Sequence, residues 1–290
     1  MRSLLLVVCV AGCGSTPHEI GRTVDRQQSA AERHAGAWEE ARRAWQNRAD
    51  EASLRVAIAR WKDAVALRDD DHEAYTMLAR AYFFLADGFI VTEGKRAGEL
   101  PDAFEQGLIN ADRGLRALSP QYEQRRQAGQ SADQAIDGLG RETAPLMYWY
   151  ALNLIRWAHV EGTFTVMKEY KRSHRIMHAV ERLDPDFYYG GADRYFGMFL
   201  AGAPGIAGGD MKEAKVRFEA ALRRAPAFFE THLLYAELYA VKAGDKKLYV
   251  SSLRYILDTP AEILPEVVPE QLRTKKKAAS LIKRTEERFP

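Results

Sequence analysis

The sequence predicts an all-α protein, built as a solenoid of helical hairpins. Two observations predict this class. Apolar residues recur at helical spacing, as in Met211, Ala214, Phe218, Ala221 and Leu222, and such a stripe marks the buried face of an amphipathic helix. Prolines follow these stretches, and a proline disfavours helix at the residue before it. No segment is a convincing strand.

The spacing and chemistry of these stretches resemble tetratricopeptide repeats (TPRs). Pro226 and Pro260 lie 34 residues apart, which is the TPR period. The first helix of a TPR has the pattern aromatic-x-x-Leu-small-x-x-Tyr, and the second has small, large and small residues in turn. The small residues let the two helices of the pair approach closely. We therefore predict about four TPR-like pairs plus extra terminal helices. The matching residues are Tyr75, Leu78, Ala79 and Tyr82, then Ala57, Trp61 and Ala64, then Ala214, Phe218, Ala221 and Pro226, then Ala236 and Tyr239.

The elements follow in order from the apolar periodicity and its proline stops. Two segments, 88–101 and 121–141, break the repeat period, and loops this long are usually functional or mobile. We predict helices near 31–48, 52–68, 72–87, 102–118, 143–161, 164–183, 187–202, 210–225, 227–243, 245–258 and 269–288.

The N-terminus has the features of a secretory signal peptide. Arg2 precedes the apolar run 4–11, which is too short to span a bilayer. The motif Val-Ala-Gly-Cys at 10–13 resembles a bacterial lipobox, in which the cysteine becomes the acylated first residue; an ordinary signal cleavage or a buried apolar N-terminus are the alternatives. We expect a signal peptide over 1–12, lipid on Cys13, a flexible tether over 13–30 and one helical domain over 31–290.

The cysteines and the charge exclude several classes of function. Cys9 would leave with the leader and Cys13 would carry lipid, so no thiol remains for catalysis or metal binding. The chain has 42 Lys+Arg against 40 Asp+Glu, and this balance supplies no basic field for nucleic acid. Gly14 after the cysteine favours the outer membrane of a Gram-negative bacterium, facing the periplasm.

The segment 184–210 differs from an ordinary repeat. It holds three tyrosines, two Gly-Gly pairs and one arginine, Arg194, amid small and aromatic residues. Gly190 and Gly191 stand where a helix should begin, and glycine allows close approach of a packed helix or a ligand. Asp210 is a plausible N-cap for the next helix. Without a preceding strand or a Gly-Lys-Ser/Thr motif, this is not a phosphate-binding loop.

The same segment resembles the signature of the TatT family, the T components associated with TRAP transporters. The resemblance is carried by Phe-Tyr-Tyr-Gly-Gly at 187–191, Arg-Tyr-Phe-Gly at 194–197, Pro204 and Gly-Gly-Asp at 208–210. It implies a periplasmic lipoprotein whose helices surround a tunnel or cleft, a homotrimer, and a DctP-type solute-binding protein as partner. The ligand would be an organic acid or an apolar molecule, and no cofactor is implied. The resemblance places Tyr188, Tyr189, Gly190, Gly191, Arg194 and Tyr195 at the cavity, with Pro204, Gly208, Gly209 and Asp210 beside it.

Arg194 is the first candidate for a ligand contact. A guanidinium among aromatic residues can bind a carboxylate with two parallel hydrogen bonds. The alternative is an ion pair with Asp193 or Asp210 that stabilises the helix pair. A ligand role predicts that Arg194→Ala weakens binding with the helical signal intact. Tyr148, Trp149 and Trp157 are core residues or line an apolar channel.

A metal site and catalysis are the weaker readings. His174 and His178, with Glu181 one turn further on, have a spacing that can bind zinc, but surface histidines are common and no HExxH motif is present. No nucleophile–base pattern stands out. We therefore expect a non-catalytic component of TRAP-type solute uptake. The alternative is an envelope scaffold that binds peptide segments of outer-membrane or cell-wall assembly proteins. A third option is a hydrolase with an unrecognised site.

Overall fold

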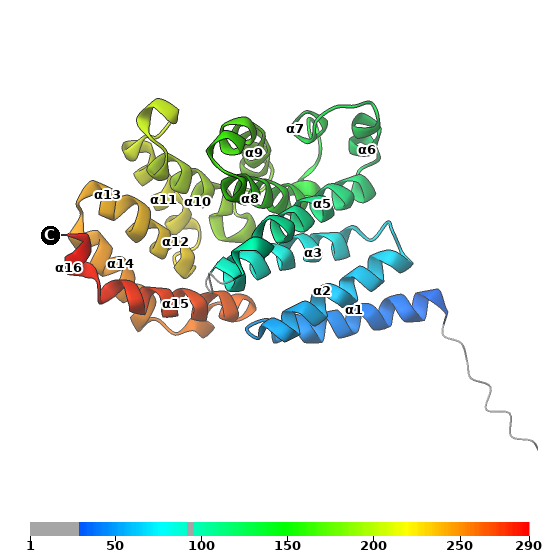
Figure 1. Cartoon of the computed structure of the whole chain (residues 1–290), viewed down its shortest axis with the longest axis horizontal. Helices are drawn as coiled ribbons and strands as arrows, with labels where there is room; N and C mark the ends of the chain where they lie inside the picture. The colour runs from blue at the N-terminus through cyan, green and yellow to red at the C-terminus, as the bar shows by residue number, and fades with distance from the viewer. Residues whose placement is uncertain (1–28, 92–95, 290) are drawn as a thin grey trace, which may run out of the picture.

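The computed structural model describes residues 29–91 and 96–289, and every regular element in these two stretches is helical. The predicted all-α class is confirmed. Figure 1 shows the helices stacked side by side as antiparallel pairs along a curved array. The predicted signal peptide, Cys13 and most of the predicted tether lie outside the described residues.

Four long pairs of neighbouring helices form most of the array. They are α1 (Ala30–Gln46) with α2 (Glu51–Leu67), α3 (His72–Leu85) with α5 (Leu100–Leu118), α8 (Ala144–Glu161) with α9 (Thr163–Leu183), and α10 (Phe187–Gly202) with α11 (Met211–Arg224). Side chains cap several N-termini: Asp50 accepts from the amide of Ser53 at 2.8 Å, and Asp71 from that of Ala74 at 2.9 Å. Such caps satisfy amides that have no partner within the helix.

The C-terminal part is more broken than the periodicity predicts. The expected helix 227–243 is α12 (Phe229–Leu234), a π-helical turn (Tyr235–Ala240) and α13 (Val241–Ala243), while α14 (Lys246–Asp258) follows the prediction closely. The expected helix 269–288 divides into α15 (Val268–Ile282) and α16 (Thr285–Arg288). A second π-helical turn (Ala86–Ile90) extends α3. π-Turns accommodate one extra residue in a helix, and the sequence period alone does not reveal them.

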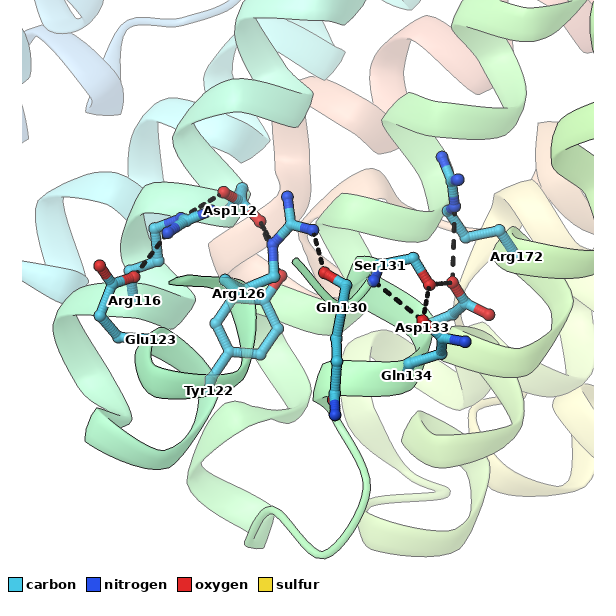
Figure 2. A network of polar contacts seen from close by, with 10 residues as sticks. All are labelled: Asp112, Arg116, Tyr122, Glu123, Arg126, Gln130, Ser131, Asp133, Gln134 and Arg172. Carbon is cyan, nitrogen blue, oxygen red and sulfur yellow. Dashed lines mark hydrogen bonds and ion pairs between the residues drawn. The ribbon is translucent and has the colours of Figure 1, made fainter. Parts of the chain in front are cut away.

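The predicted break at 121–141 contains two short helices, α6 (Pro120–Gln127) and α7 (Ala132–Ala135). Figure 2 shows the polar network that holds them: Asp112 of α5 accepts from Nε of Arg116 at 2.6 Å, the hydroxyl of Tyr122 at 2.7 Å and Nε of Arg126 at 3.2 Å. Arg172 of α9 lies 3.5 Å from Asp133 of α7. This segment is therefore an ordered part of the array that ties α5 to α9.

Small residues allow the close packing that the repeat pattern requires. Ala57, Ala64, Ala79, Ala214 and Ala221 are fully buried, and fitted small residues let neighbouring helices interlock without voids. The large partners Trp61 and Phe218 are equally buried. These alanines and their two large partners thus form part of the core.

The two ends of the described array meet. Arg48, in the turn between α1 and α2, forms a buried ion pair with Glu270 of α15 at 2.7 Å, and its Nη2 donates to the carbonyl of Glu266 at the same distance. Arg273 of α15 lies 3.6 Å from Asp87, which also pairs with Arg156 of α8. Figure 1 shows α15 running back beside the α1–α2 turn. Charged side chains therefore join two parts with separate apolar clusters.

No helix within 29–91 or 96–289 combines the length and the apolar character that crossing a bilayer would require.

Candidate functional site

The first turn of α10 has a left-handed backbone. Tyr188, Tyr189 and Gly190 have φ of 47°, 61° and 68°, so the right-handed helix starts at Gly191. For a residue with a Cβ, this conformation costs about 1–2 kcal/mol, and strain of this kind collects at functional sites. The sequence marked this place through its glycines, but the unusual residues are the two tyrosines.

Arg194 holds this turn in place. Its Nη1 donates to the carbonyl of Tyr189 at 3.0 Å, and its Nη2 donates to the carbonyl of Tyr188 at 3.1 Å and the hydroxyl of Tyr148 at 3.0 Å. The guanidinium carbon lies 4.6 Å from the ring centre of Phe228, and the residue is 3% exposed. Most of its donors are thus directed at the protein itself.

The acidic partners considered for Arg194 are engaged elsewhere. Asp193 pairs with Arg217 at 3.1 Å and with Arg224 at 2.9 Å. Asp210 caps α11, where its side chain accepts from the amides of Lys212 at 2.9 Å and Glu213 at 3.0 Å. Arg194 stabilises its surroundings through carbonyl and hydroxyl oxygens rather than through these carboxylates.

Aromatic rings from α8, from α10 and from Phe228, the residue before α12 (Phe229–Leu234), surround the turn. Tyr148 and Trp149 of α8 meet Tyr188, with ring centres 5.6 Å and 4.9 Å apart, and Tyr189 stacks on Phe228 at 4.6 Å. Burial raises the pKa of the Tyr188 hydroxyl, so this phenol stays neutral at physiological pH. The group Tyr148, Trp149, Tyr188, Tyr189, Phe228 and Arg194 is hereafter called the aromatic–arginine cluster.

Glycines permit the closest contacts in this region. A Cβ on Gly191 would lie 2.5 Å from the ring of Tyr148, and one on Gly190 would lie 3.2 Å from the backbone of Ala221. In the loop before α11, a Cβ on Gly209 would lie 2.0 Å from the carbonyl oxygen of Ala203, and Gly208 has a φ of 92°. Both Gly-Gly pairs thus serve close packing in the described structure.

The remaining candidates from the sequence lie at other places. Pro204, Gly208, Gly209 and Asp210 form the α10–α11 loop, and Trp157 is partly buried against two apolar clusters. Tyr195 faces α9, where its hydroxyl bonds to Ser173 at 2.7 Å and to Nδ1 of His174 at 2.9 Å. The structure therefore brings together seven of the predicted residues: Tyr148, Trp149, Tyr188, Tyr189, Gly190, Gly191 and Arg194.

Sequence reasoning missed the charged residues beside the cluster. Arg80 of α3 lies over Tyr188, its guanidinium carbon 5.1 Å from the ring centre, and donates to Oε1 of Glu270 at 3.1 Å. The hydroxyl of Tyr189 donates to Glu266, next to α15. Arg80 and Glu270 are 190 residues apart in the chain, so no local pattern could have paired them.

The histidine pair of α9 is held by protein contacts. His174 bonds to Tyr195 and lies edge-on to Phe199, with ring centres 4.2 Å apart, while His178 bonds to Glu181 at 3.0 Å. Within the described parts of the chain, no group of three or more His, Cys, Asp or Glu side chains is arranged to hold a metal ion.

His174 should make stability depend on pH. Burial lowers its pKa from the ordinary 6.5 to about 4. Between these values the unfolded chain binds the extra proton, so the stability present above pH 6.5 is lost as the pH falls towards 4. We expect His174→Phe to lose less stability than the parent between pH 7 and 5 in urea unfolding. An unchanged slope in His174→Phe would contradict this.

Two surface hollows lie away from the aromatic–arginine cluster. One, of about 370 Å³, is lined by Arg125, Gln130, Gln134, Asp137 and Arg175 near α6 and α7. The other, of about 250 Å³, is lined by Ala220, Arg223 and Arg224 on α11.

The fold and the aromatic–arginine cluster together define the class of protein. It is an all-α array of helix pairs in which ion pairs join α15 to the α1–α2 turn, and it holds a buried group of aromatic and arginine side chains. Within this class, the chain belongs to the TatT family. The model of that family, described as the TRAP transporter T-component, matches residues 61–289. The protein is therefore a component associated with a TRAP transporter system, and the resemblance predicted from 187–210 is confirmed. A comparison with curated proteins finds no match.

Proposed function

We propose that the protein is a non-catalytic, lipid-anchored periplasmic component of TRAP-type solute uptake. It would bind a DctP-type solute-binding protein, a small ligand, or both. The family match over 61–289 carries this proposal, because it covers the array from within α2 to its C-terminal end, including the whole aromatic–arginine cluster. The proposed anchor is lipid on Cys13, in the outer membrane, and the proposed assembly is a homotrimer.

The aromatic–arginine cluster is the proposed place of ligand contact. It lies where α8, α10 and Phe228, just before α12, meet, next to the ion pairs that join α15 to α3 and to the α1–α2 turn. Ligand sites combine apolar and aromatic walls with a few polar groups that fix orientation. Tyr188 and Tyr189 are half-buried, and their strained backbone is consistent with a functional constraint.

Affinity purification from the native envelope tests the partner. We expect the tagged full chain to enrich a DctP-type solute-binding protein over an unrelated lipoprotein bait, because T components are associated with TRAP systems. Mass spectrometry of the eluates measures this enrichment. Recovery of assembly-machinery proteins without any TRAP component would support the scaffold alternative and contradict the proposal.

A further inference from the structure

Charged side chains make the contact between α15 and the N-terminal helix pairs. Arg48, in the α1–α2 turn, binds Glu270 of α15 with two hydrogen bonds, from Nε to Oε1 at 3.2 Å and from Nη2 to Oε2 at 2.7 Å. Arg80 of α3 donates to Oε1 of the same carboxylate at 3.1 Å. Arg273 of α15 lies 3.6 Å from Asp87, in the π-helical turn after α3. Each of these bridges runs through a guanidinium group.

The apolar core does not continue across this contact. Elsewhere in the array, neighbouring apolar clusters share partly buried side chains, namely Phe83 and Trp157 between the first two, Leu200 between the second and that of α10 and α11, and Leu248 between that one and the C-terminal cluster. Over the residues that the structure describes, the cluster of α1 to α5 and that of α12 to α15 share none. Burial of apolar surface is the main force that holds packed helices together, and it holds α15 to α12 and α14 rather than to the N-terminal pairs.

Opening this contact costs less free energy than its short distances suggest. Charged groups that separate regain their hydration, and this offsets most of the lost attraction. One bridge is already partly hydrated, because the side chains of Arg273 and Asp87 are 27% and 22% exposed, against 5% for Arg48. Nη1 of Arg273 is buried without a hydrogen-bond partner among the described residues, so water can supply a bond that the closed contact lacks.

We infer that α15 is a latch, whose charged contact with the α1–α2 turn and α3 opens and closes while the helices on both sides stay folded. Contacts between structural units that are polar rather than apolar permit such motion. The C-terminal helices stay attached on their other side, where Tyr235 stacks on Phe218 of α11 with ring centres 5.1 Å apart. The latch gives the array a closed and an open state, and a binding partner that prefers one of them would shift their populations. This inference does not depend on the proposed function.

Distance measurements by electron spin resonance test the latch on the full chain. Spin labels on keto-bearing amino acids at Gln46 of α1 and Lys276 of α15, two exposed positions, leave both cysteines unchanged. We expect two distances in the parent, a shorter closed one and a longer open one. The open fraction should rise several-fold between about 0.05 and 1 M NaCl, because salt screens the partly exposed bridge of Arg273. A single distance at every salt concentration would overturn the inference.

A second label pair checks that the helices stay folded. Gln46 and Lys62 both occupy exposed positions of the α1–α2 pair, so the distance between them should stay single under the same conditions. If this distance broadens together with the distance from Gln46 to Lys276, the protein unfolds rather than opening at a latch, and the inference is wrong.

Glu270→Lys assigns the opening to the charged contact. It replaces the carboxylate that two arginines share with a third cation, so the labels should show mainly the open distance, with the helical circular dichroism of the parent. Glu286→Lys makes the same change on α16, where the side chain is 83% exposed, and should keep the closed fraction of the parent. Equal open fractions in these two folded variants would contradict the latch.

Arg273→Met keeps the assignment decisive even if Glu270→Lys does not fold. It removes only the bridge to Asp87, which still pairs with Arg156, so the fold should persist. The open fraction should rise about twofold or more over that of Glu286→Lys, as expected for the loss of one partly exposed ion pair. An open fraction no larger than that of Glu286→Lys would show that this bridge does not hold the latch closed, and would overturn the inference.

Discussion

Arg194→Met should lower the free energy of unfolding by about 3 kcal/mol, because it leaves buried polar groups without donors. The carbonyls of Tyr188 and Tyr189 and the hydroxyl of Tyr148 all accept from this guanidinium. Without these bonds, the left-handed turn loses the contacts that offset its backbone strain. Urea unfolding followed by circular dichroism measures the loss.

Two further variants make this result specific. Arg194→Lys keeps the charge but has a single nitrogen, which cannot reach all three acceptors, so we expect most of the same destabilisation. Arg43→Met, on the exposed face of α1, should unfold with the parent. If Arg194→Met is as stable as the parent but binds partner or solute more weakly, Arg194 is a ligand-binding residue, as its aromatic surroundings in the sequence suggested.

Local periodicity was sufficient for most of the long helices, because the pattern that marks a buried helix face repeats within one or two turns of chain. The apolar stripe of α11 and Pro226 after it place that helix within one residue at each end. The 34-residue spacing of Pro226 and Pro260 likewise brackets α12 to α14. The helices within 121–141 were not predicted, because they are short and lack an apolar stripe. Their positions depend on tertiary contacts, such as those of Tyr122 with Asp112 and of Asp133 with Arg172.

The candidate site was predictable only in part, because many of its interactions join residues that are far apart in the chain. Gly190 and Gly191 indicated a close approach before α10, and the contacts of Gly191 with Tyr148 bear out a tight packing at this point. The left-handed tyrosines were not foreseeable, because their conformation depends on donors from Arg194. The pairing of Arg80 with Glu270 joins α3 to α15, and the two residues are 190 positions apart in the chain. Sequence thus marked an unusual segment, and tertiary contacts determine what that segment does.

Gly191→Ala should lower the free energy of unfolding by about 2–3 kcal/mol, because the added methyl group overpacks the core. The added Cβ would lie 2.5 Å from Cε2 and 2.8 Å from Cζ of Tyr148. That ring cannot move aside easily. Tyr148 is 2% exposed, its hydroxyl accepts a hydrogen bond from Arg194, and its ring packs against Trp149.

The matched control is Gly36→Ala, in the exposed middle of α1, where an added Cβ meets nothing within 4 Å. Alanine there should stabilise the protein by roughly 0.5–1 kcal/mol, because glycine weakens a helix interior. The two substitutions are chemically identical, so their opposite signs in urea unfolding isolate the contact with Tyr148. In a Tyr148→Leu background, which removes the ring, Gly191→Ala should cost clearly less. A Gly191→Ala variant as stable as Gly36→Ala would show that Tyr148 can move aside, and that the aromatic–arginine cluster is looser than its contacts imply.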